Sequence, residues 1–65
     1  MARGEVHTVN RAGLWRNELK SELRELSKHT SKADAIARGR HYAHRRGAEH
    51  VIHNLDGTVA ERHTY

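Results

Sequence analysis

The chain has 65 residues, of which 35% are hydrophobic, and this length allows one small domain with a marginal core. It contains no cysteine, which excludes disulfides and thiolate metal sites. Twelve Lys and Arg against eight Asp and Glu give a formal charge of +4 at pH 7, a balance that suits a nucleic acid or an acidic protein surface as partner.

The first expected element is a short strand. Residues 1–4 are interpreted as a flexible lead, and residues 5–65 as a single small domain. Residues 6–9 (VHTV) are rich in strand formers, and residues 10–13 (NRAG) carry a turn signal.

Residues 14–28 fit two structures. Trp15, Leu19, Leu23 and Leu26 recur at helical spacing among good helix formers, which favours an amphipathic helix across 15–28. Alternation also fits two short strands joined by a turn at residues 20–22. The local pattern leaves both structures open.

Residues 33–46 predict a helix. Ser31 supplies an N-cap hydroxyl, Asp34 follows three residues later, and Gly47 stands where the helix should stop. Small or apolar residues at positions 35, 36, 39, 42 and 43 share one face, which suits a helix lying flat on a sheet. Glycine costs about 1 kcal/mol relative to alanine inside a helix, and close approach of the backbone to a strand would explain Gly39.

The last element is a hairpin. Residues 49–53 (EHVIH) and 58–63 (TVAERH) flank a turn that contains Asp56 and Gly57. An Asp-Gly pair between β-branched runs is a strong hairpin signal, because glycine adopts the positive φ that the turn needs.

Several features occur in a fixed order along most of the chain. They are Gly13 and Trp15, residues 31–36 (SKADAI), Arg38, Arg40, Ala43, Gly47, residues 51–53 (VIH), Asp56-Gly57 and Thr64-Tyr65. In this order they resemble domain-of-unknown-function family 2188, which groups small bacterial proteins. Gly39 departs from the family pattern, which usually has Ala there, and Tyr42 stands where Leu is usual.

The resemblance implies strands across 15–28. It therefore implies an α+β fold with the order β-β-β-α-β-β, in which one antiparallel sheet packs against a single helix. It carries no activity, cofactor or catalytic residue with it.

The candidate chemistry is limited. Seven histidines are present, and His41 and His44 lie three apart on the predicted helix, but a zinc site needs three or four converging ligands. We expect solvated histidines and no metal site. There is no nucleophile elbow, phosphate loop or ordered acid–base set, so we expect no catalytic residue, no cofactor and no enzymatic activity.

The basic residues of the predicted helix are the best functional lead. Guanidinium groups on one helix face can neutralise phosphates, whereas the scarcity of Asn and Gln argues against base readout. The competing interpretation is a solvated surface whose last turn carries cations that the helix dipole favours. The candidate nucleic-acid-binding residues are Lys32, Arg38, Arg40, His41, Arg45 and Arg46.

Two functions follow from this pattern. The first is a small basic non-enzymatic module that binds nucleic acid through phosphates with weak sequence preference. The alternative is a small dimeric adaptor or inhibitor, bacterial or phage-encoded, that binds a protein partner.

We also expect a homodimer. A scaffold this small usually needs an additional source of stability, and this chain has no cysteine to form disulfides. No apolar run approaches the roughly 18 residues of a membrane span, so we expect no membrane association and a cytoplasmic location.

Overall fold

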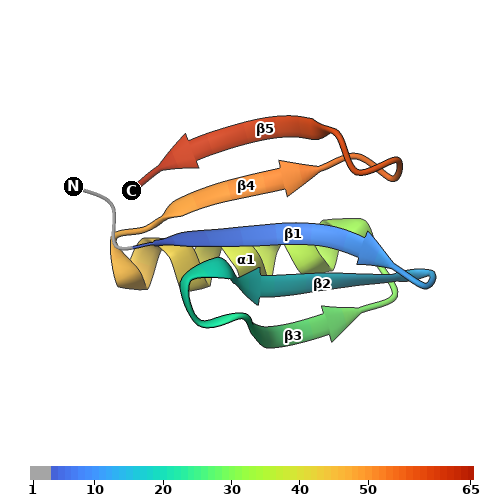
Figure 1. Ribbon diagram of the computed structural model, residues 1–65, viewed down its shortest axis with the longest axis horizontal. Coiled ribbons are helices and arrows are strands. Elements are labelled where there is room, and N and C mark those ends of the chain that lie inside the picture. The colour runs from blue at the N-terminus through green and yellow to red at the C-terminus, as the bar shows by residue number, and fades with distance from the viewer. Residues whose placement is uncertain (1–3) are drawn as a thin grey trace.

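Five strands and one helix make up the described part of the chain, residues 4–65 of a computed structural model (Figure 1). The order β-β-β-α-β-β and the α+β class are confirmed. For residues 1–3 the expected flexible lead lies outside the described residues, whereas the Gly4 carbonyl accepts a hydrogen bond from the Glu49 amide at 3.2 Å. The elements are β1 (Glu5–Arg11), β2 (Leu14–Leu19), a 3-10 turn η1 (Lys20–Glu22), β3 (Arg24–His29), α1 (Lys32–Arg46), β4 (Glu49–His53) and β5 (Val59–Thr64).

The sheet has the order β3-β2-β1-β4-β5 and is mixed. β1 and β4 run parallel, with Val6 opposite His50 and Thr8 opposite Ile52, whereas the other three strand pairs are antiparallel. The prediction of one antiparallel sheet is therefore wrong for this pair. The reason is α1, which returns the chain to the end of the sheet where β1 begins, so that β4 starts beside β1 and runs in the same direction (Figure 1).

Residues 14–29 form a hairpin, and the alternative of a helix across 15–28 is wrong. β2 pairs with β1 on one side and with β3 on the other, so the strand ladders use the backbone groups that a helix would use internally. Leu19 is buried, whereas Leu23 is 90% exposed in a left-handed conformation with φ of 50°. The leucines at helical spacing therefore do not share a face.

The remaining predicted elements are confirmed. A two-residue turn at Ala12 and Gly13, both with positive φ, joins β1 to β2. The Ser31 hydroxyl accepts a hydrogen bond from the Asp34 amide at 3.4 Å, and Gly47 ends α1 with φ of 62°. The closing hairpin pairs β4 with β5.

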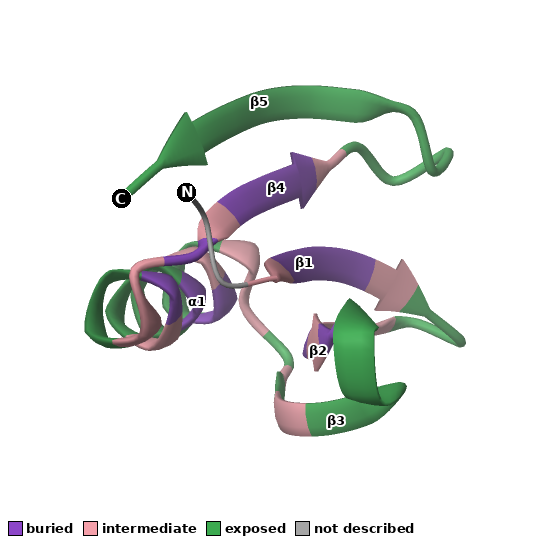
Figure 2. Cartoon of the chain, turned by 60° about the vertical axis from the view of Figure 1, so that its left-hand side comes forward, coloured by how far each residue is buried: buried purple, intermediate pink, exposed green. Residues whose placement is uncertain are grey.

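The core lies between α1 and the central strands. Ala35, Gly39 and Ala43 of α1 are buried, as the predicted helix face requires, and β1 and β4 carry most of the buried strand residues (Figure 2). β5 lies beyond the edge of the helix, and all six of its residues are exposed (Figure 2). The buried apolar cluster of this core consists of Val6, Leu19, Ala43 and Ala48, and Leu26 and Tyr42 pack against it.

Gly39 brings the helix backbone onto polar side chains of the sheet. A Cβ atom at this position would lie 2.7 Å from Thr8 Oγ1, 2.6 Å from His50 Nε2 and closer still to Asn17 Oδ1. These three side chains are buried and come from three different strands. The close approach that the sequence suggested for Gly39 is thus confirmed, and the neighbouring groups are polar.

We expect Gly39→Ala to destabilise the protein. Helix propensity alone would stabilise this variant by about 1 kcal/mol, but overpacking costs about 1–3 kcal/mol and would exceed that gain here because three neighbouring side chains are displaced. Urea unfolding followed by circular dichroism measures the difference. Ala37→Gly, on the exposed side of the same helix, is the control and should lose about 1 kcal/mol. A Gly39→Ala variant as stable as the parent would contradict this packing.

Candidate nucleic-acid interface

Helix α1 carries the whole formal net charge of the chain. It holds five of the twelve Lys and Arg residues and one of the eight Asp and Glu residues, so its formal charge is +4. The other fifty residues contain seven of each kind and are neutral in sum. The positive potential is therefore concentrated on one element.

The arginines of the strands are paired with carboxylates. Arg11 binds Glu18 at 2.8 Å through two nitrogens, and the hydrogen bond from Arg11 lowers the pKa of Glu18. None of the α1 arginines lies within ion-pair distance of a carboxylate in residues 4–65. The glutamates that could have interrupted a basic surface thus neutralise arginines of the strands. The further pairs are Arg16–Glu25, Arg24–Glu22, Arg62–Glu5 and Arg62–Glu49.

Three of the predicted residues form one row along α1. Arg38, His41 and Arg45 are exposed and recur at spacings of three and four, which places them on one side of the helix. Their row borders the side of α1 that faces β3, because His29 of β3 lines the same hollow as Arg38 and His41. This hollow has a volume of about 460 Å³ and also includes Asp34 and Ala37.

A second hollow continues the row toward the end of α1. It has a volume of about 370 Å³ and is lined by His41, Tyr42, Arg45 and Arg46. His41 therefore belongs to both hollows. Two adjacent concave sites with arginines at their rims are suited to two neighbouring anionic groups.

The structure separates two predicted residues from this row. The Lys32 ammonium lies 5.1 Å from the centre of the Trp15 ring, a cation–π contact at the start of the helix. Arg40 lies outside the row, although it shares one hollow with His41 and His44, and it lines a second hollow with residues of β5. Sequence reasoning missed His29, because its place beside Arg38 depends on the register of β3 against β2, which pairs His29 with Trp15.

A chain of buried hydrogen bonds runs beneath the helix. The Asn17 amide nitrogen donates to the Ala35 carbonyl at 2.9 Å and to Ser27 Oγ at 3.1 Å, which fixes its oxygen toward Thr8. The Thr8 hydroxyl donates to that oxygen at 2.6 Å. Since its only proton is used there, the Thr8 oxygen must accept the 2.7 Å hydrogen bond from His50 Nε2.

These hydrogen bonds determine which ring nitrogen of His50 carries the proton. The Nε2 atom carries a proton, and burial lowers the pKa of the ring from 6.5 to about 4, with the charges of His63 and Arg40 acting in the same direction. His50 is therefore neutral at pH 7. Its Nδ1 atom then carries a lone pair and no proton.

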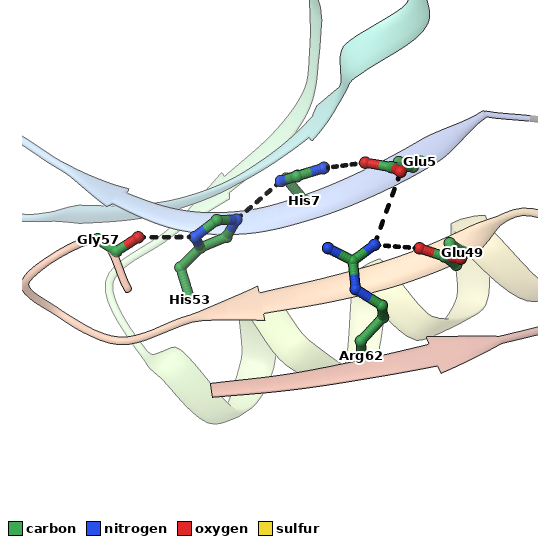
Figure 3. Close-up of polar contacts among 6 residues, drawn as sticks. All are labelled: Glu5, His7, Glu49, His53, Gly57 and Arg62. Atoms are coloured by element: carbon green, nitrogen blue, oxygen red, sulfur yellow. Dashed lines mark hydrogen bonds and ion pairs between the residues drawn. The ribbon is translucent and has the colours of Figure 1, made fainter. Parts of the chain in front are cut away.

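The opposite face of the sheet holds a second polar cluster, drawn in Figure 3. His53 Nδ1 donates to the Gly57 carbonyl at 3.0 Å, and its Nε2 lies 2.7 Å from His7 Nδ1. His7 Nε2 lies 2.7 Å from Glu5 Oε1, and Arg62 bridges Glu5 to Glu49 (Figure 3). The cluster ties β1, β4 and β5 together.

Three contacts of this cluster link two acceptor oxygens through two imidazole rings. Each contact needs a proton, and two neutral rings supply two, so the three bonds are complete only when the pair holds one extra proton. Burial lowers the pKa of His7, while the hydrogen bond to Glu5 acts against it. The hydrogen bond from His7 in turn lowers the pKa of Glu5.

Neither polar cluster provides a metal centre. Within residues 4–65, no three His, Asp or Glu side chains lie close enough together to hold a metal ion.

The helix α1 is too short and too polar to cross a membrane, and no other helix of the described residues can do so.

Comparison with known proteins gives one match. The model of a family described as "Uncharacterized protein conserved in bacteria (DUF2188)" matches residues 6–65. No match was found among curated proteins or among solved structures. The match covers all five strands and the helix apart from Glu5.

We expect the protein to lose stability as the pH falls from about 6.5 to about 4. The unfolded chain binds a proton at His50 near pH 6.5, whereas the folded chain resists this protonation until about pH 4. The stabilisation is complete above pH 6.5, and its loss amounts to about 3 kcal/mol. Urea unfolding between pH 4.5 and 7.5 measures the slope, and NMR titration of the His50 ring identifies the group.

The matched control for the pH profile is His41→Gln, which removes an exposed histidine that takes no part in the buried chain. This variant should keep the slope of the parent. A His50 titration midpoint near 6.5 in the folded protein would contradict the assignment.

Proposed function

The chain belongs to this bacterial family, whose description assigns no activity. We propose that it is a small non-enzymatic module that binds nucleic acid. Binding occurs through phosphate contacts of α1, with weak sequence preference and in the cytoplasm. One observation carries the proposal: the formal charge of +4 resides on α1, and its arginines are not paired with carboxylates in residues 4–65.

The geometry supports phosphate contact over base readout. Arg38 and Arg45 flank His41 along about two turns of helix, so the row spans roughly 10 Å at about 1.5 Å per residue. Each guanidinium presents a planar set of donors that matches phosphate oxygens. The row contains no Asn or Gln, the side chains that pair with adenine. Contacts of this kind fix the position of a polyanion without reading its sequence.

The adaptor alternative is favoured by one feature, the edge strand β5. All its residues are exposed, and an unpaired edge can add a strand from a second copy. In an antiparallel pairing centred on Arg62, Glu61 of one copy lies opposite His63 of the other, which are complementary charges when His63 is protonated. A homodimer formed this way leaves the row on α1 free, so self-association is compatible with nucleic-acid binding.

We expect Arg38→Gln and Arg45→Gln each to weaken binding to a 20-nucleotide DNA by severalfold at 50 mM salt and to reduce the salt slope by about one unit. Fluorescence anisotropy over a salt series measures both quantities. Arg24→Gln makes the same charge change on the exposed start of β3 and is the matched control. Equal losses in all three variants would show that net charge, and not the α1 row, governs binding. Absence of binding at 50 mM salt would overturn the proposal.

Glu61→Lys should shift a homodimer toward monomer, because it places a cation opposite His63 of the second copy. Sedimentation velocity across a concentration series measures this shift. Glu22→Lys makes the same charge change in η1, away from β5, and should leave the association unchanged. A parent protein that sediments as a monomer at high concentration would contradict the pairing through β5.

A further inference from the structure

A groove lies between α1 and the overhanging strand β5. It has a volume of about 370 Å³, within the roughly 300–1,000 Å³ of small-ligand sites. Its walls combine apolar side chains from α1 and β4 with charged and aromatic side chains from α1, β5 and the residue that follows β5. The lining residues are Ile36, Arg40, His50, Ile52, Glu61, His63 and Tyr65.

His50 gives this groove a defined hydrogen-bonding requirement. The ring is 1% exposed yet lines the groove, and its Nε2 atom is engaged with Thr8. No group of residues 4–65 hydrogen-bonds Nδ1. Arg16 Nε is the one fully buried side-chain nitrogen or oxygen of those residues that lacks a partner, so the unpartnered Nδ1 keeps a small exposed surface. A ligand in the groove therefore meets a bare acceptor nitrogen and must offer it an N–H or O–H donor.

The groove also offers surface on which a flat group can pack. Ile36, Ile52 and Tyr65 line it, and the Tyr65 ring meets His44 edge-on with ring centres 5.7 Å apart. Arg40 belongs to this groove and to the neighbouring hollow of about 360 Å³ that His44 and Tyr65 also line. A flat group in the groove can thus be attached to an anion held beside Arg40.

We propose that this groove receives one unpaired nucleobase, whose N–H edge donates to His50 Nδ1 while the adjoining phosphate lies at Arg40. The inference rests on the proposed binding of nucleic acid and narrows it to single strands. In a duplex the Watson–Crick N–H groups are engaged and the base faces are stacked, so only an unpaired base can enter. Phosphate contact alone would favour the duplex, which has the higher charge density.

Three probes of equal length distinguish the base site from the phosphate contacts of α1. They are a single-stranded 12-nucleotide DNA, the same strand with abasic residues, and its blunt duplex. We expect the affinity of the single strand to be at least about tenfold higher than that of the abasic strand, which is the contribution of one base stacked on side chains. We also expect it to exceed the duplex. Addition of the single strand, and not of the abasic strand, should shift the His50 Nδ1 resonance in a ¹⁵N NMR spectrum.

Tyr65→Ala is the variant of choice, since the side chain is partly exposed at 38% and its loss leaves the core intact. It should remove most of the advantage of the single strand over the abasic strand and leave duplex binding unchanged. Arg38→Gln, on the other side of α1, should weaken all three probes by a similar factor. Equal affinity for the single and abasic strands would overturn the base site while the phosphate row stands. Failure of all three probes to bind at low salt would overturn the proposed function itself.

Discussion

At Gly39 the α1 backbone packs directly against three polar side chains of the sheet, and this contact aligns the helix with the strands. Thr8, Asn17 and His50 come from β1, β2 and β4, and their hydrogen bonds run directly under the helix. A buried polar group needs a partner at a fixed distance, so this chain specifies how the three strands and α1 are aligned. A core with few large apolar side chains thereby acquires a defined packing.

The same hydrogen bonds also determine a chemical property of the surface groove. The Ala35 carbonyl orients the Asn17 amide, and this orientation assigns the donor and the acceptor of each following hydrogen bond. His50 Nε2 is therefore the donor to Thr8, and His50 Nδ1 carries no proton. β5 lies beyond the helix, so this nitrogen faces a groove instead of the closed core. The hydrogen bonds that stabilise the fold therefore also leave an acceptor nitrogen at the wall of the groove.

Charged side chains are arranged differently on the strands and on α1. On the strands, alternation places arginines and glutamates on neighbouring positions of one face, where they neutralise each other at a stability gain of about 0–1 kcal/mol per exposed pair. On α1, Asp34 stands alone among five cations, and arginines in the last turn are further favoured by the helix dipole. The formal net positive charge of the protein therefore lies on the helix.

Signals that lie within a few residues of one another were enough to predict α1 between Ser31 and Gly47, the hairpin around Gly57, and the close approach at Gly39. The family resemblance supplied the strands across 15–28, where local spacing favoured a helix. The parallel pairing of β1 with β4, the place of His29 beside Arg38, and the lone pair of His50 could not be predicted from the sequence. They depend on contacts between residues far apart along the chain: His50 and Thr8 are 42 residues apart, and the packing of α1 on the sheet brings them together.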